Sequence, residues 1–123
     1  MEQQNLKYAD INWVDLGPNV NGSVQAGLRP CICVSNSRGL RYSEIAVVIP
    51  LTTAKKGRNL PTHLSIPASM GLGRDSVVLA EQLICVERKK VREHITNIAN
   101  RPQLIEALNK CIKISLNMVE GYA

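Results

Sequence analysis

The sequence predicts a mainly β, α+β fold: a small antiparallel barrel or sandwich with one C-terminal helix packed against it. About five short apolar or alternating segments follow one another, and turns rich in Gly separate them. The clearest helical pattern of apolar residues lies near the C-terminus. A chain of 123 residues is long enough for one core and too short for two. Residues 1–123 are therefore expected to form a single domain.

The expected strands span residues 10–16, 28–36, 44–52, 62–66 and 75–87, the last interrupted at 81–82. The second and third are apolar on both faces, which is typical of strands buried on both sides. Pro50 cannot donate to a sheet ladder, so the third strand must reach an edge or a bulge there. Residues 1–7 are expected to be flexible, and residues 88–94 to form one or two helical turns.

The C-terminal helix is expected over residues 101–119. Asn100 can cap it, and Pro102 falls in the first turn, where a missing N–H costs little. Gly121 ends it. The apolar stripe that predicts the helix comprises Leu104, Leu108, Cys111, Ile112, Leu116 and Val119, with Ser115 among them.

The composition of the chain indicates the cellular compartment in which it is expected to work. The chain is 45% hydrophobic and 20% charged, as in soluble globular proteins. It has neither the apolar stretch of a signal peptide nor the roughly 20 apolar residues that a membrane span needs, so a cytoplasmic location without membrane contact is expected. The four Cys are then expected to be reduced and to act as small core residues. With two His and no chelating spacing, neither a metal nor another cofactor is expected.

The formal net charge of +5 is compatible with a polyanionic partner. Aromatic residues make up only 3% of the chain. This argues against a protein that binds single-stranded nucleic acid by stacking the bases on several aromatic side chains. The net charge by itself neither predicts nor excludes binding to nucleic acid.

Arg29 is the first candidate site residue. It lies where a polar, Gly-containing loop meets an apolar strand, and its planar guanidinium suits bidentate contact with a phosphate. Thr52 lies at a strand end, where its hydroxyl can bond a phosphoryl oxygen. Ser23 and Gln25 add small polar groups in the loop. Each also has an ordinary interpretation, as a surface Arg, a strand Thr or turn residues.

His63 is the natural candidate for an acid or base near neutral pH, although no neighbour in sequence supports it. His94 lies in a basic segment and is expected to be solvated. Lys55 and Lys56 belong to a basic loop at 55–59. The sequence contains no paired acids, phosphate-binding loop, zinc signature or nucleophile elbow.

Several blocks resemble the MazF/PemK toxins, the mRNA interferases of type II toxin–antitoxin systems. The motif Gly-Ser-Val-Gln-Ala-Gly-Leu-Arg-Pro at 22–30 is similar to the signature Gly-Ser-Glu-Gln-x-Gly-x-Arg-Pro of that family. A second signature is similar to residues 47–53. The other matching blocks are residues 10–18, 34–36, 60–64 and 75–82, so that the resemblance covers roughly residues 8–118 in order.

The resemblance implies a barrel of the plasmid-maintenance-toxin type (CcdB/MazF-like), a homodimer and sequence-specific, metal-independent cleavage of single-stranded mRNA. The 2′-hydroxyl of the substrate would attack the adjacent phosphate and leave 2′,3′-cyclic phosphate and 5′-hydroxyl ends. The essential Arg and Thr of the family fall on Arg29 and Thr52. The expected substrate contacts are Ser23, Gln25, Thr53, Lys55, Lys56, His63 and Gln82.

Two alternatives stay open. Arg is a poor base because its ordinary pKa is about 12.5–13.8, so either a perturbed Arg29 or another group deprotonates the 2′-hydroxyl. The chain could also be a catalytically weak or inactive toxin fold that only binds its antitoxin, or a gyrase poison resembling CcdB. Its ending, Gly121-Tyr122-Ala123, differs from the Trp-Gly-Ile type of CcdB relatives.

Three positions depart from the family pattern: Val24 replaces the usual Glu, Ile84 a common basic residue, and Leu40 a frequent Asn. In either hypothesis a MazE-like antitoxin is implied, whose acidic, disordered C-terminal segment would fold over the basic groove. The dimer interface is expected to use apolar residues of the terminal helix and adjacent strands. Alternatively, all of these residues are buried in the core of the chain itself.

Overall fold

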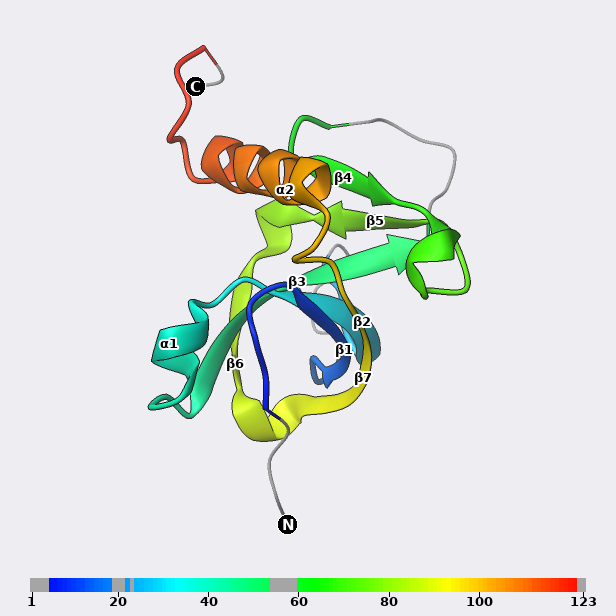
Figure 1. The fold of residues 1–123 in the computed structure, drawn as a ribbon, viewed down its shortest axis with the longest axis vertical. Coiled ribbons are helices and arrows are strands. Elements are labelled where there is room, and N and C mark those ends of the chain that lie inside the picture. Colours follow the sequence, from blue (N-terminus) through cyan, green and yellow to red (C-terminus); the bar gives the residue numbers. More distant parts are fainter. Residues whose placement is uncertain (1–4, 19–21, 23, 54–59, 122–123) are drawn as a thin grey trace.

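The computed structural model describes residues 5–18, 22, 24–53 and 60–121 and contains seven strands and one long helix (Figure 1). The strands are β1 (Asp10–Asp15), β2 (Leu28–Cys33), β3 (Ile45–Thr53), β4 (His63–Ile66), β5 (Ser76–Leu79), β6 (Ile84–Glu87) and β7 (Val91–Asn97). The α-helices are α1 (Ser37–Leu40) and α2 (Pro102–Ser115), and the 3₁₀ turns are η1 (Ala68–Met70), η2 (Ala80–Gln82) and η3 (Arg88–Lys90).

All strand pairs are antiparallel, in the order β4-β5-β3-β2-β1-β7, and β6 also pairs with β3. This confirms the predicted antiparallel, mainly β fold with a C-terminal helix. In the described ranges the ladders do not close into a complete ring, because β6 and β7 follow each other through η3 without pairing. Figure 1 shows β1, β2, β6 and β7 curving around the lower half, while β4, β5 and α2 stack above them.

β3 is the strand that joins the two halves. Its first residues pair with β6, and its central residues, including Pro50, pair with β2. Its last three residues pair with β5, on the edge of β3 away from β2. Between the ladder with β6, which ends at Val48, and the ladder with β5, which begins at Leu51, lies Pro50, which has no N–H to donate. The prediction of an edge or a bulge at Pro50 is therefore met only as a gap between two ladders, because Pro50 still pairs with Cys31 and no bulge is present there.

Two clusters of buried aliphatic residues form the core. The larger lies between β1, β2, β3, β5 and α2, and comprises Ala9, Ile11, Ile32, Ile49, Leu51, Ile66, Val78, Ala80, Ile98, Leu108 and Cys111. The smaller lies beside α1 and β6, and comprises Leu6, Val14, Cys31, Cys33, Leu40, Ala46 and Val48. Leu6 is only 6% exposed, so the expectation of a flexible N-terminus fails at this residue. Residues 1–4 lie outside the described part.

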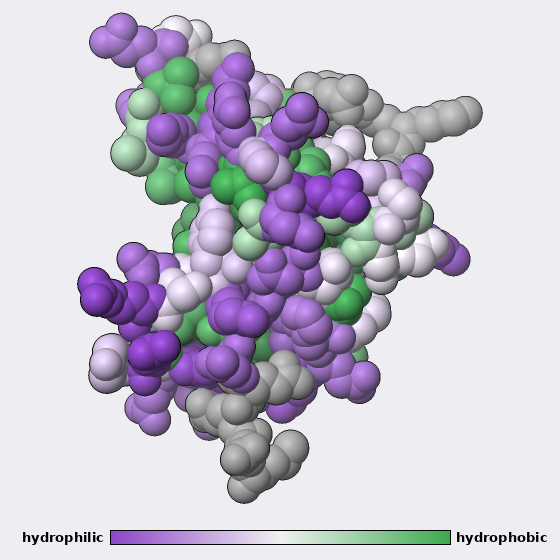
Figure 2. Space-filling model, in the orientation of Figure 1, coloured by the Kyte–Doolittle hydropathy of each residue, from purple (hydrophilic) through white to green (hydrophobic). Residues whose placement is uncertain are grey.

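The helix α2 begins with Pro102 in its first turn, as predicted. Asn100 does not cap it: the cap position is Arg101, and no side chain bonds the first turn. The helix buries Leu108 and Cys111 on one face. It ends at Ser115, earlier than predicted, and Asn117 has a positive φ of 59°. Figure 2 shows hydrophobic surface near this end, where Leu116 and Met118 are 53% and 66% exposed.

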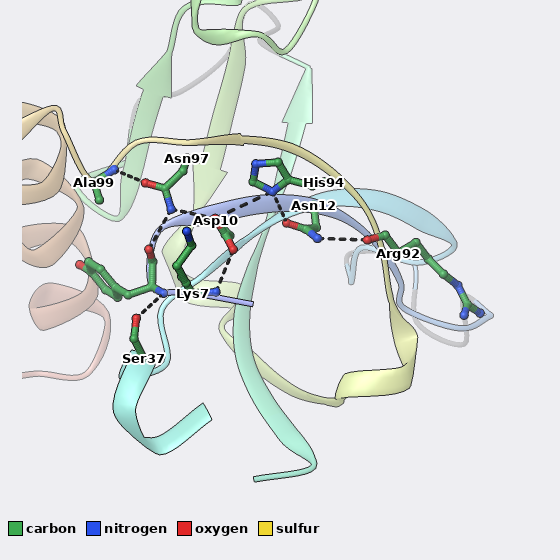
Figure 3. A network of polar contacts seen from close by, with 9 residues as sticks. Lys7, Asp10, Asn12, Ser37, Arg92, His94, Asn97 and Ala99 are labelled. Atoms are coloured by element: carbon green, nitrogen blue, oxygen red, sulfur yellow. Dashed lines mark hydrogen bonds and ion pairs between the residues drawn. The ribbon is translucent and has the colours of Figure 1, made fainter. Parts of the chain in front are cut away.

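Residues 91–97 form a strand, so the prediction of helical turns over 88–94 is wrong beyond η3. Partners distant in sequence decide this, because β7 pairs with β1 through two register shifts around Asn12. Buried polar side chains bridge the shifts (Figure 3). Asn97 Nδ2 donates to Asp10 Oδ1 at 2.7 Å, and Asn12 Nδ2 donates to the Arg92 carbonyl at 3.0 Å.

His94 belongs to the same network. Its Nδ1 lies 3.1 Å from Asn12 Oδ1 and 3.8 Å from Asp10 Oδ1. It is therefore a half-exposed partner of buried polar groups rather than a solvated helical residue. None of the helices in the described part of the chain has the length and apolar content that a membrane crossing requires.

Candidate active site

A hollow opens where β2 and β3 separate. The last pair between these strands is Cys31 with Pro50. Continuing the antiparallel register by two residues would place Arg29 opposite Thr52, but no pair joins β2 and β3 beyond Cys31 and Pro50. The side chains at the two strand ends therefore border a space that this ladder does not fill.

The hollow has a volume of about 460 Å³ and is lined by both Arg29 and Thr52. Thr53 and Ser76 add two further hydroxyls, and Trp13 contributes an aromatic face. Arg29 is half-buried, and its Nε donates to the Ala26 carbonyl at 3.1 Å. This bond orients the guanidinium while its remaining N–H groups have no other described partner. A fixed cation with neighbouring hydroxyls suits an anionic group.

A second hollow of about 390 Å³ is lined by described residues of the loop between β1 and β2. Val24 and Gln25 line it together with Arg29. Arg29 thus borders both hollows.

Backbone and side-chain bonds hold this loop in place. Gly17 and Gly27 close its base, where the N–H of Gly27 donates to the Gly17 carbonyl at 2.7 Å. Both glycines have positive φ, 80° and 75°, a conformation that favours Gly. Gln82 of η2 accepts the N–H of Gln25 at 2.9 Å with its Oε1. Gln82 and Gln25, both predicted to contact substrate, are thus brought together, with Gln82 anchoring the loop.

The other residues predicted to contact substrate differ in where they lie relative to the two hollows. Thr53 lines the hollow beside Thr52. Ser23, Lys55 and Lys56 lie outside the described residues. His63 does not line either hollow.

His63 is instead paired with Glu81. Its Nε2 lies 2.9 Å from Glu81 Oε2, and the Thr62 hydroxyl donates to Glu81 Oε1 at 2.9 Å. Burial alone would raise the pKa of the Glu81 carboxyl, but the hydrogen bonds from His63, from its own backbone and from Thr62 outweigh burial and lower it. Because Glu81 belongs to η2, this pair fixes β4 against the turn that carries Gln82.

The lowered pKa of Glu81 predicts a contribution to stability that depends on pH. Such a contribution is present above the ordinary value of 4.5 and disappears as the pH falls through the lowered folded-state pKa. We expect Glu81→Gln to cost at most about 1 kcal/mol of unfolding free energy at pH 7, because it weakens the partly exposed hydrogen bonds with His63 and Thr62, and much less near pH 3. Urea unfolding at both pH values measures this, and an equal cost at both would contradict it.

Three lining residues with polar or aromatic side chains, Trp13, Arg74 and Ser76, were not identified from sequence. Trp13 is 38% exposed and borders the hollow from β1. Arg74 borders it from the turn before β5. The Gly-Leu-Gly sequence before Arg74 predicts a turn, but a basic residue after a turn is too common to indicate a site.

Cys31 lies close to Arg29 without taking part in its chemistry. Burial raises the pKa of its thiol to about 12, although the nearby Arg29 charge acts in the opposite direction. The thiol is therefore protonated and structural. The prediction that the cysteines are core residues is confirmed for Cys31, Cys33 and Cys111, whereas Cys85 is exposed.

Comparison with known families gives the site its context. Residues 7–116 match the family described as PemK-like, MazF-like toxin of type II toxin-antitoxin system. The match covers most of the chain and includes both hollows. The chain belongs to this family.

Relatives of similar length support the assignment. The endoribonuclease EndoA of Bacillus subtilis is 33% identical over 116 residues, which is 94% of this chain and 97% of that protein. The endoribonuclease MazF of Staphylococcus saprophyticus is 32% identical over 114 residues, 92% of each chain.

Solved structures agree with the fold. MazF from Deinococcus radiodurans superposes with a TM-score of 0.76 at 21% identity, over 92% of this chain and 97% of that one. A mycobacterial endoribonuclease in complex with its cognate antitoxin gives 0.75 at 20% identity, over 93% and 97%. At this level of identity the likeness shows the fold.

The three departures from the family pattern lie in different places. Val24 is 49% exposed and lines the second hollow, so it replaces a charged group with an apolar one there. Ile84 lies on β6 opposite Val48, away from both hollows. Leu40 is buried in the smaller core cluster, and its carbonyl accepts a bond from Arg88 Nη1.

Proposed function

We propose that this chain is a MazF-type toxin that cuts single-stranded mRNA at specific sequences without a metal ion. The observation that supports it most directly is the hollow shared by Arg29 and Thr52, at the point where β2 and β3 separate. Family membership and relatives that are endoribonucleases agree with this function.

In the proposed reaction, a ribose 2′-hydroxyl attacks the adjacent phosphate. A bond forms between O2′ and phosphorus, the bond to O5′ breaks, and the proton of the attacking hydroxyl is balanced by one taken up at the 5′ oxygen. The products are a 2′,3′-cyclic phosphate and a 5′-hydroxyl. Arg29 would neutralise the charge that builds on the phosphorane, and the Thr52 hydroxyl would donate to it and orient it.

The described lining of this hollow supplies cations, hydroxyls and apolar groups. Stabilisation of a developing negative charge is the catalytic contribution that such a lining supports. Gln25, held by Gln82, and Thr53 would contact the RNA, since each lines a hollow that Arg29 borders. His63 would act through η2, because it touches Glu81 and not the hollow.

The proposed partners follow from the same family. We expect a cytoplasmic homodimer, with the exposed Leu116 and Met118 as candidates for part of its apolar interface. A MazE-like antitoxin with an acidic C-terminal segment would cover the basic groove, consistent with the net charge of +5. Solved neighbours include an endoribonuclease with its cognate antitoxin and MazE–MazF complexes.

The test incubates the purified chain with single-stranded mRNA in EDTA and sequences the 5′ ends of the fragments. We expect cuts at one recurring short sequence. The 5′ ends should accept phosphate from polynucleotide kinase without prior phosphatase treatment, because cleavage leaves a 5′-hydroxyl. Activity that needs added Mg²⁺ would contradict metal independence, and 5′-phosphate ends would contradict the chemistry.

Expression in a host cell distinguishes the nuclease from the alternative, a toxin fold that acts only by binding. Growth arrest with intact mRNA would favour a toxin that acts by binding alone. Arrest in which RNA degradation precedes any DNA-damage response supports the nuclease rather than a gyrase poison.

A further inference from the structure

Arg74 lines the same hollow as Arg29. It follows the turn made by η1 and residues 71–73, whose glycines Gly71 and Gly73 have φ values of 100° and 79°. Figure 1 shows this turn beside the end of β3, where Thr52 and Thr53 lie. Leu72, Gly73 and Arg74 all line the hollow. The turn therefore brings a second guanidinium to the space that Arg29 borders.

No described carboxylate neutralises this guanidinium. The neighbouring Asp75 carboxylate forms a different contact: its Oδ1 accepts the N–H of Ala68 at 2.8 Å. Arg74 forms no ion pair with a described residue, and the described lining of the hollow includes neither Asp nor Glu. Two guanidinium groups without a carboxylate partner among the described residues thus border one hollow of about 460 Å³.

A phosphodiester carries one negative charge, so a single phosphate cannot neutralise both arginines. A strand of RNA repeats that charge at every nucleotide, and the hollow is larger than one phosphate group. Two cations on the lining of one hollow therefore match two phosphates of one strand.

We propose that Arg74 is a second phosphate-binding residue, which holds the RNA phosphate next to the one that Arg29 and Thr52 act on. Trp13, on the same lining, offers its ring to the base between the two phosphates. Arg74 binds and positions the strand and does not touch the reacting atoms. The inference rests on the proposed function, because it concerns the same site and the same substrate.

The experiment measures binding of an RNA oligonucleotide that contains the mapped cleavage sequence, with a 2′-deoxy nucleotide at the attacking position to prevent cutting. Affinity is measured from 50 to 200 mM salt. For single strands, each phosphate contact contributes about 0.7 to the slope of log affinity against log salt. Arg74→Ala is expected to flatten the slope by about 0.7 and to weaken binding about ten- to a hundred-fold at low salt.

Two further variants separate contact from overall charge. Arg74→Lys keeps the charge and is expected to keep the slope. Arg41→Ala removes the same charge from an exposed position after α1, at the opposite end of β2 and β3, and is expected to leave the slope unchanged. In cleavage assays Arg74→Ala should raise KM and leave kcat near the wild-type value. Thermal unfolding confirms that each variant is folded.

The outcomes distinguish this inference from the proposed function. If the wild-type protein cuts RNA and Arg74→Ala keeps the wild-type slope and KM, the role of Arg74 is wrong while the function stands. Equal flattening by Arg74→Ala and Arg41→Ala would show an effect of net charge and would also overturn it. If the wild-type protein neither binds nor cuts RNA, both proposals fail.

Discussion

Arg29→Ala is expected to lower the rate constant for RNA cleavage by a factor of at least about 10²–10³, the usual effect of removing one group that stabilises transition-state charge. The guanidinium is oriented by its bond to the Ala26 carbonyl and borders both hollows. In the proposed reaction, its loss would remove charge at the phosphorane rather than at a distant part of the substrate. The effect should therefore appear in kcat more than in KM. Single-turnover cleavage of the mapped oligonucleotide measures it.

Two controls accompany this variant. Arg41→Ala removes an equal charge outside the site and is expected to cleave at the wild-type rate. The lost bond to Ala26 costs about 0.5–1.5 kcal/mol of stability, so thermal unfolding must show that Arg29→Ala remains folded. Wild-type cleavage by a folded Arg29→Ala protein would remove Arg29 from the mechanism.

Ile49→Ala is expected to lower the free energy of unfolding by about 2–5 kcal/mol. Ile49 is fully buried in the larger core cluster, directly opposite Ile32 on β2. Truncation leaves a cavity beside the point where β3 changes partner, and the surrounding strands cannot collapse into it without breaking their pairing. The loss is a large part of the roughly 5–15 kcal/mol that stabilises a typical domain.

The same strand supplies a matched control. Ile45 is 52% exposed at the start of β3, so Ile45→Ala makes the same chemical change with little loss of packing. We expect its cost to stay below about 1 kcal/mol. Urea unfolding monitored by circular dichroism compares the two variants. Equal midpoints would contradict the assignment of Ile49 to the core.

Local chemistry explains which features were predictable. Pro50 lacks an N–H in any fold, so a gap in pairing on one edge of β3 could be read from its position alone. The doubly apolar runs of β2 and β3 require burial on both sides, and both strands are found near their predicted ranges. Pro102 suits only the start of a helix, and α2 begins there.

Features that depend on a distant partner could not be predicted in this way. Residues 91–97 form a strand because β1 offers an unpaired edge, and the buried side chain of Asn12 bridges the register shifts. The pairing of His63 with Glu81 and the anchoring of Gln25 by Gln82 also join residues far apart in the chain.

By itself, the sequence determined that this is an aliphatic, antiparallel domain with a cation and a hydroxyl at two strand ends, and the family resemblance identified them as Arg29 and Thr52. Only the tertiary structure decided that these two ends flank one hollow and that the turn carrying Arg74 also lines it. The reason is physical: propensity and periodicity act over a few residues, whereas a site is assembled from groups whose distances are set by strand register and by the position at which a strand changes partner.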